Sequence, residues 1–142
     1  MASLFTKIID GQIPGRFVWQ DDQCVAFLTI EPLTPGHTLV VPRDEVEVWT
    51  DLSPQLMGHL TSVAQTIGRA QRAEWDSPFV GLLIAGFDIP HVHLHVMPTW
   101  TAADMNFRNA DANPTAEAMD DAAQRLRNRL RDQGAADAVP VD

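Results

Sequence analysis

A run in which histidine alternates with apolar residues, HVHLHVM at positions 91–97, constrains the fold of this chain more than any other segment. Side chains along a β-strand point alternately to opposite faces of the sheet. The run therefore predicts a strand that places His91, His93 and His95 on one face and the intervening apolar side chains on the other. Because a strand rises about 3.3 Å per residue, neighbouring histidines on that face would lie about 6.5 to 7 Å apart. That spacing lets them share one small ligand, so the run predicts a site built on a rigid strand.

Length and composition favour one domain over residues 1–142, since 142 residues with 45% hydrophobic content can fill a single core. The only cysteine, Cys24, cannot form an intramolecular disulfide, and a reducing compartment is compatible with it. The start of the chain lacks a signal-peptide pattern, and no run of about 18 apolar residues could span a membrane. We therefore expect a cytoplasmic protein without a membrane segment.

The net charge of −9 argues against a polynucleotide partner. Affinity for a nucleic-acid backbone depends on many lysine and arginine contacts, and this chain has only 10 such residues against 19 aspartates and glutamates. A small phosphate compound remains possible where local groups overcome the overall repulsion. The expected ligand is therefore a small molecule.

Periodicity and turn residues predict an α+β fold with an antiparallel sheet and a packed long helix, because the connections are too short for parallel crossovers. The tail from Gly134 onward has no apolar pattern, and we expect it to be loose. The predicted elements are a short helix from Ser3 to Ile9, a hairpin over 16–20 and 23–29, a strand over 37–42, a helix from Ser53 and Pro54, a strand over 79–85 buried on both faces, the histidine strand, and a helix opened by Asn113 and Pro114.

The histidine row allows three interpretations, because a neutral imidazole can be a metal ligand, a nucleophile or an ordinary exposed side chain. A metal site would need a further ligand such as His37 or His59, and histidines spaced along a strand diverge from a tetrahedral centre. A nucleophile needs its far nitrogen held by an acceptor, so that the attacking nitrogen keeps its lone pair. His93, in the middle of the row, has a histidine on each side to orient it and to contact phosphate. The strict alternation favours attack by His93 on a phosphorus centre.

The run at 91–97 resembles the signature of the histidine triad superfamily, His-φ-His-φ-His-φ-φ, in which φ is apolar. Residues 4–14, 26–32 and 35–42 resemble the opening helix and the next two signatures of that family, in the same order. The resemblance covers about residues 1–100, and the loop, helix and tail over 101–142 add nothing specific. It implies an antiparallel sheet that is extended across a homodimer, and a nucleotide hydrolase or nucleotidyl transferase without cofactor or catalytic metal.

By this resemblance, His93 attacks the α-phosphate of a nucleoside monophosphate ester, anhydride or phosphoramidate and forms a nucleotidyl-histidine intermediate. His91 and His95 would orient it and contact phosphate, and His37 would close the cluster from the neighbouring strand. Asp88 falls near the leaving group, where a carboxylate repels phosphate, acts as a general acid if burial keeps it protonated, or is simply a solvated turn residue. The implied nucleoside pocket consists of apolar residues that could equally belong to the core: Leu4, Phe5, Ile8, Ile30 and Leu39.

Some positions depart from the family pattern. Thr29 stands where members commonly place an acidic residue that holds the ribose hydroxyls, and Phe87 replaces a glutamine that would donate to phosphate. A neutral hydroxyl makes weaker hydrogen bonds than a carboxylate, by about 1 kcal/mol or more. These departures support an alternative function, a nucleotide-binding or scaffolding protein with a weakened site; a histidine-ligated metal hydrolase is a third. Ser3, Thr6 and Glu45 stand where some branches hold a structural zinc, so no such zinc is expected here.

Overall fold

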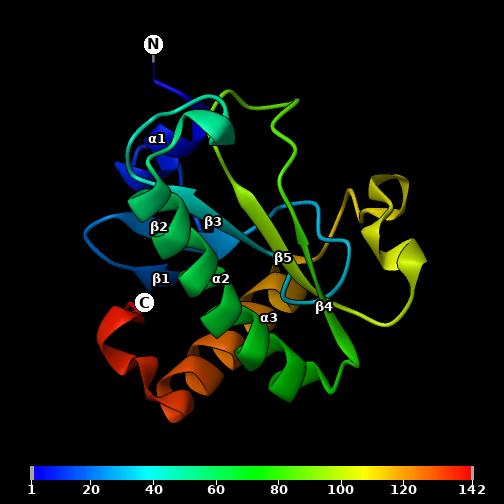
Figure 1. The fold of residues 1–142 in the computed structure, drawn as a ribbon. Helices are drawn as coiled ribbons and strands as arrows, with labels where there is room; N and C mark the ends of the chain where they lie inside the picture. Colours follow the sequence, from blue (N-terminus) through cyan, green and yellow to red (C-terminus); the bar gives the residue numbers. More distant parts are fainter. Residues whose placement is uncertain (1, 142) are drawn as a thin grey trace.

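Five antiparallel strands form the centre of the protein, whose computed structural model describes residues 2–141 (Figure 1). The strands lie in the order β1-β2-β3-β5-β4, and every neighbouring pair is antiparallel. The predicted α+β class is therefore confirmed. The strands are β1 (Phe17–Gln20), β2 (Cys24–Leu28), β3 (Thr38–Pro42), β4 (Phe79–Leu83) and β5 (Leu94–Thr99), and the helices are α1 (Leu4–Ile9), α2 (Pro54–Trp75) and α3 (Ala116–Leu130). Short helical turns are η1 (Trp49–Asp51), η2 (Ala102–Met105), η3 (Phe107–Asn109), η4 (Arg131–Ala135) and η5 (Ala136–Ala138).

The two faces of the sheet carry separate apolar clusters. In β2, Ala26 and Leu28 belong to the larger cluster, which packs against α2 and α3, whereas Val25 and Phe27 belong to the smaller one, which packs against α1. Figure 1 shows α2 and α3 together on one side of the sheet. Because strand side chains alternate between faces, β2 and β3 are buried on both sides. We call the side with α2 and α3 the helix face and the side with α1 the cavity face.

Serine side chains begin two helices as the sequence predicts. The hydroxyl oxygen of Ser3 accepts a hydrogen bond from the Thr6 amide at 3.0 Å, and that of Ser53 accepts one from the Leu56 amide at 3.1 Å. Such bonds satisfy amide groups that have no partner in the first turn of a helix. The third helix differs, since α3 is capped by Thr115 rather than opened by Asn113.

Strand β4 contradicts the prediction of a strand buried on both faces. It lies at the edge of the sheet, where β5 is its only strand partner among the described residues. Phe79 is 67% exposed and Leu82 is 51% exposed. The continuous apolar run correctly predicts a strand. Such a run does not distinguish a central strand from an edge strand whose apolar side chains are exposed.

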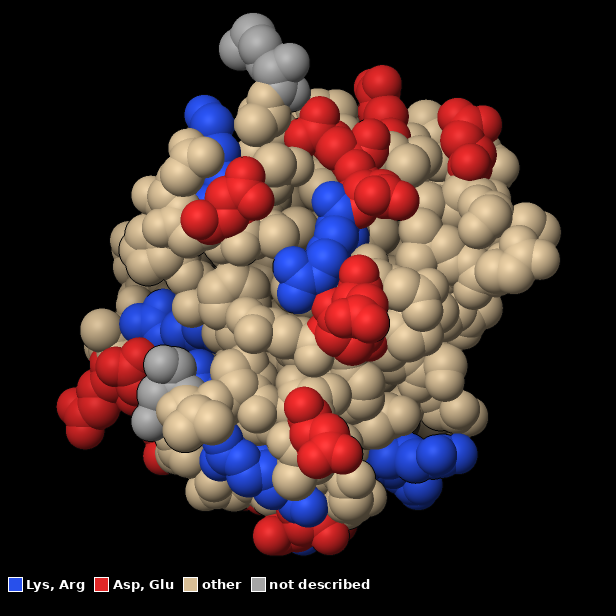
Figure 2. All heavy atoms as spheres, turned by 90° about the vertical axis from the view of Figure 1, so that its left-hand side faces the viewer, with Lys and Arg blue, Asp and Glu red and all other residues tan. Residues whose placement is uncertain are grey.

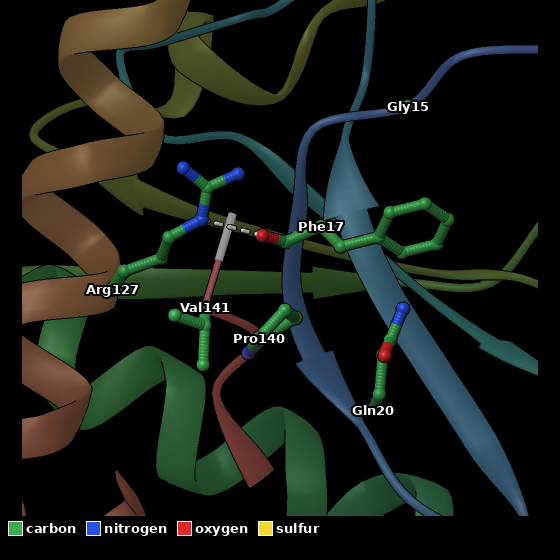
Figure 3. A pocket seen from close by; sticks show the side chains of 6 residues that line it. All are labelled: Gly15, Phe17, Gln20, Arg127, Pro140 and Val141. Carbon is green, nitrogen blue, oxygen red and sulfur yellow. Dashed lines mark hydrogen bonds between the residues drawn. The ribbon is translucent and has the colours of Figure 1, made fainter.

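The expected loose tail is also wrong, because the C-terminal segment packs on the helix face. Val139 is buried in the larger apolar cluster, and the Arg131 guanidinium donates to the Pro140 carbonyl at 2.8 Å. Figure 3 shows Pro140 beside the hydrogen bond that Arg127 of α3 donates to the Phe17 carbonyl of β1 at 2.7 Å. These contacts fix a segment whose small and acidic residues give no periodic signal.

The molecular surface carries charges of both signs. On the face drawn in Figure 2, basic and acidic side chains lie interspersed, so the basic groups of that face do not gather into one continuous patch. Even α2, the longest described helix, is not apolar enough to cross a membrane, and the same holds for every other helix within 2–141.

Candidate active site

The cavity face contains a pocket of about 550 Å³ between α1, the sheet and the loops around residues 30 and 89. The structure brings nearly all of the predicted site residues to this pocket. His93, His95 and Asp88 line it together with every residue predicted to bind the nucleoside: Leu4, Phe5, Ile8, Thr29, Ile30 and Leu39. The rings of His37 and His91 do not line it.

The alternation predicted for the histidine row holds, although the strand begins later than expected. Val92 and Leu94 lie in the larger cluster on the helix face, whereas His93 and His95 face the pocket with their ring centres 5.0 Å apart. Strand β5 begins only at Leu94. Before it, the Val92 amide donates to the Val46 carbonyl at 2.8 Å, which holds this segment against the loop after β3.

His93 presents a free lone pair to the pocket. Its Nδ1 lies 2.8 Å from the main-chain carbonyl oxygen of His91. A carbonyl can only accept, so Nδ1 carries the hydrogen and, in the neutral ring, Nε2 is left without one. Phe5 packs edge-on against the ring with the two ring centres 4.9 Å apart, and His93 is only 6% exposed. The orientation required of a nucleophile is therefore fixed by a peptide group and an aromatic wall.

His95 has the opposite hydrogen arrangement. The Leu33 amide donates to His37 Nδ1 at 3.0 Å, so the neutral His37 ring carries its hydrogen on Nε2. This Nε2 lies 3.0 Å from His95 Nδ1 and donates to it. The hydrogen of a neutral His95 is therefore on Nε2. His93 and His95 thus offer the pocket a lone pair and an N–H donor side by side.

Burial keeps these three rings neutral near pH 7, because desolvation disfavours the charged imidazolium. Burial, followed by the neighbouring His95, lowers the pKa of His37 to about 3. Burial, followed by His93, lowers the pKa of His95 to about 4, although the charge of Asp88 acts in the opposite direction. Burial also lowers the pKa of His93 below its usual 6.5. The hydrogen placement deduced for neutral rings therefore applies at physiological pH.

His91 is fully buried, and both of its ring nitrogens have partners within the protein. Nε2 lies 2.8 Å from the Pro42 carbonyl oxygen, and Nδ1 lies 2.7 Å from the Ser3 hydroxyl. The predicted contact between its ring and phosphate does not fit this position. Its main-chain carbonyl instead holds His93, which keeps the orienting part of the predicted role. His37 likewise does not line the pocket, and it orients His95 through the hydrogen bond that its Nε2 donates to His95 Nδ1.

Several wall residues were missed by the sequence analysis. Phe107 of η3 lies edge-on to His95, with ring centres 5.0 Å apart, and it comes from a segment without a recognisable pattern. Arg16 and Glu31 also line the pocket, and Arg16 pairs with Asp120 of α3 at 2.8 Å. Phe27 belongs to a resemblance segment and alternates correctly in β2, so its place in the wall could have been predicted.

The positions that depart from the family pattern lie at and beside the pocket. The Thr29 hydroxyl accepts a hydrogen bond from the Glu31 amide at 3.3 Å and lines the wall. Phe87 is 95% exposed and does not line it. Asp88, which follows Phe87, is exposed at the rim next to the two histidines. Its exposure matches the solvated turn residue among the alternatives for this carboxylate.

His59 does not join the histidine row. It lies on α2, on the helix face, and its Nε2 is 2.7 Å from Asp21 Oδ2 in the β1–β2 turn. Burial raises the pKa of Asp21, but hydrogen bonds led by that of Trp19 outweigh this and bring it to about 2. Asp21, Cys24 and His59 are the one group of metal-type ligands that lie within 4.8 Å of one another among the described residues. The suggestion that His59 completes a metal site on the histidine strand is therefore wrong.

Comparison with known proteins agrees with the resemblance. A family model for the HIT domain matches residues 10–102, which include all three histidines of the row. The chain belongs to the HIT, or histidine triad, family. An uncharacterised HIT-like protein of Saccharolobus solfataricus is 34% identical to it over 103 residues, which cover 69% of this chain and 74% of that protein.

Solved HIT structures share its fold. A zinc-bound histidine triad protein from Mycobacterium smegmatis superimposes with a TM-score of 0.82 at 27% identity, covering 96% of this chain and 98% of that one. A HIT family hydrolase from Legionella pneumophila gives a TM-score of 0.61 at 26% identity, covering 68% and 91%. The HIT match contains β1 to β5, whereas α1, which supplies part of the pocket wall, and α3 lie outside it.

Proposed function

We propose that this HIT protein cleaves a nucleoside monophosphate ester, anhydride or phosphoramidate at the α-phosphorus through a nucleotidyl-His93 intermediate. The observation that carries the proposal is the opposite hydrogen placement on two adjacent rings. The lone pair of His93 Nε2 and the N–H of His95 Nε2 face one apolar pocket of about 550 Å³. A site of this kind suits a ligand with a flat apolar group at one end and a phosphate at the other.

The reaction would proceed in two displacements. His93 Nε2 attacks phosphorus, and the bond between phosphorus and the leaving group breaks. The leaving group departs with the electron pair of that bond and takes a proton from water at the open rim, which leaves hydroxide. The ring of the adduct is positively charged, and its Nδ1–H remains bonded to the His91 carbonyl, whose dipole stabilises that charge. The His95 Nε2–H donates to a phosphate oxygen. Water then attacks phosphorus, and the P–N bond breaks and returns its electron pair to His93 Nε2. The proton released by the attacking water neutralises the hydroxide formed in the first displacement.

Trapping the adduct tests this function. The native protein is mixed with an adenosine phosphoramidate, quenched rapidly without acid, and weighed by intact-mass spectrometry. We expect one added nucleotidyl group in the native protein and in the control His59→Ala, whose ring lies on the helix face, and none in His93→Ala. Nucleotide binding without adduct or turnover would favour the weakened-site alternative, and activity that a chelator abolishes would favour a metal hydrolase.

We also propose that β4 forms the interface of a homodimer in which the sheet continues into a second copy. An edge strand with exposed amide and carbonyl groups is a template for pairing with another strand, and here it also exposes Phe79 and Leu82. The family resemblance supports this assembly. Sedimentation equilibrium should give twice the chain mass for the native protein and a single chain mass for Leu82→Glu. A native protein that is monomeric at all concentrations would refute it.

A further inference from the structure

Four side chains next to the nucleophile satisfy one another's hydrogen bonds: Ser3 and Thr6 at the start of α1, Glu45 in the loop after β3, and His91. The Ser3 hydroxyl lies 2.7 Å from His91 Nδ1. Glu45 Oε1 accepts hydrogen bonds from the Ser3 amide and, at 2.8 Å, from the Thr6 hydroxyl. Hydroxyls are not preferred zinc ligands. The cluster is completed by hydrogen bonds between its own members.

The direction of the Ser3–His91 hydrogen bond follows from the other side of the ring. The Pro42 carbonyl can only accept, so His91 Nε2 carries the hydrogen of the neutral ring. His91 Nδ1 is therefore an acceptor, and the Ser3 hydroxyl donates to it. With both nitrogens engaged, the ring cannot turn without losing a buried hydrogen bond. The residue whose carbonyl holds His93 Nδ1–H is thus fixed through its own side chain.

The same serine also fixes the wall of the pocket. Its hydroxyl oxygen caps α1 by accepting from the Thr6 amide at 3.0 Å. Two residues after Ser3, Phe5 packs edge-on against both His91 and His93, with ring centres 5.9 and 4.9 Å apart. One hydroxyl therefore ties the helix that forms the apolar wall to the segment that orients the nucleophile.

We propose that Ser3 and Glu45 are positioning residues for His93: Ser3 holds the His91 ring, and Glu45 holds Ser3 and Thr6 in the geometry that this requires. The proposal rests on the proposed role of His93 as nucleophile. Neither residue touches the reacting phosphorus, so their removal should slow attack rather than weaken nucleotide binding. A ring displaced by about 1 Å from its productive position is enough to lower a rate about 100-fold.

Ser3→Ala is the decisive variant, and Ser53→Ala is its matched control. Both serines are helix N-caps of the same bond type, but the Ser53 hydroxyl bonds the Leu56 amide of α2, whereas the Ser3 hydroxyl also bonds a histidine ring. We expect Ser3→Ala to lower kcat about 10- to 100-fold with little change in KM, whereas Ser53→Ala keeps native kinetics. Equal kinetics in both variants would reduce Ser3 to a helix cap and overturn the proposal.

Two variants of Glu45 test its role separately, because its side chain is exposed and a substitution there does not disturb the core. Glu45→Gln retains an oxygen that can accept from the Ser3 amide and the Thr6 hydroxyl, so we expect near-native kcat. Glu45→Ala removes the acceptor and should lower kcat, by less than Ser3→Ala. A loss of equal size in Glu45→Gln and Glu45→Ala would show that the charge matters and not the positioning bond.

A spectroscopic readout separates this proposal from the proposed function. Imidazole nitrogen-15 NMR shifts report which ring nitrogen carries the hydrogen, and they require no turnover. In the native protein we expect hydrogen on His91 Nε2 and on His93 Nδ1. In Ser3→Ala the Pro42 carbonyl still accepts the His91 Nε2 hydrogen, so we expect the shift of His91 Nδ1 to move to that of a nitrogen that accepts no hydrogen bond. If native protein forms no adduct but Ser3→Ala still changes these shifts, the function fails and the positioning stands. Unchanged shifts in Ser3→Ala would overturn the positioning.

Discussion

The helix face and the cavity face are built from the same strands but differ in what they leave open. On the helix face, Val40, Leu94 and Val96 are sealed beneath α2 and α3. On the cavity face, Leu39 and His95 alternate with these residues, and the short helix α1 covers only part of the surface. Strand alternation therefore lets one tightly packed layer support both a core and a site, and the rigidity of the site derives from the packing behind it.

The largest effect on stability is expected from a substitution on the helix face. Leu126 of α3 is fully buried, and Leu126→Ala should lower the free energy of unfolding by about 2 to 5 kcal/mol, because it removes apolar burial and leaves a cavity. Ile30→Ala is the matched change on the cavity face. Ile30 is 73% exposed and lines the pocket, so its loss should change stability by less than about 0.5 kcal/mol but raise KM.

Urea denaturation and steady-state kinetics of both variants check this contrast. If Ile30→Ala unfolds as easily as Leu126→Ala, the cavity face contributes to the core as much as the helix face does. If Leu126→Ala changes KM while remaining folded, the two faces are not separable in function.

A second prediction concerns pH, and its expected effect is smaller. The pKa values of His37 and His95 in the folded protein, about 3 and about 4, lie below the usual 6.5. Between the folded and the unfolded pKa values the unfolded chain binds more protons. The contribution of these two histidines to the free energy of unfolding is therefore complete above about pH 6.5 and falls as the pH decreases toward their folded pKa values. Each histidine kept neutral contributes a slope of at most about 1.4 kcal/mol per pH unit.

Denaturation at a series of pH values measures this slope. Asp21 loses its own contribution only as the pH falls from its usual 3.8 toward about 2. Hydrogen bonds lower the pKa values of Glu45 and Glu74 from the usual 4.5, so these carboxylates lose theirs only below about pH 5, and the interval between pH 6.5 and 5 isolates the histidines. His37→Gln should flatten the curve in that interval. A native protein whose stability does not change from pH 7 to 4 would contradict burial of neutral rings on the cavity face.

The smallest expected effect concerns the polar end of the pocket. Thr29→Asp places a carboxylate where Thr29 offers a neutral hydroxyl, and charge-assisted hydrogen bonds to ribose hydroxyls are stronger by about 1 kcal/mol. We expect kcat/KM for a ribonucleotide substrate to rise several-fold over that for its 2′-deoxy analogue. Thr29→Asn, which has the same shape without the charge, is the control. No difference between the two variants would mean that the ribose does not reach this wall.

Local chemistry explains which parts of the structure the sequence could predict. The alternation around His93, the serine caps and the β1–β2 hairpin depend on neighbours within a few residues, and they were predicted correctly. The six proposed nucleoside contacts, from Leu4 to Leu39, came from the resemblance, and the structure brings them to one pocket. Their roles in binding stay predictions.

Tertiary context explains the errors. The burial of β4 depended on its place at the edge of the sheet, and the position of the tail depended on Val139 packing into the larger apolar cluster. Hydrophobic periodicity reports neither. The His91 ring turned away from the pocket because Ser3 and Pro42, both distant in sequence, supply its partners. Phe107 entered the wall from an irregular segment.

The hydrogens that distinguish His93 from His95 are set by two main-chain groups, the His91 carbonyl and the Leu33 amide. A peptide group is present whatever side chain a position carries, and only proline at position 33 would delete the amide. Substitutions at Leu33 during evolution can therefore change the surface of the loop, while the main-chain amide continues to decide which ring nitrogen of His95 carries the hydrogen.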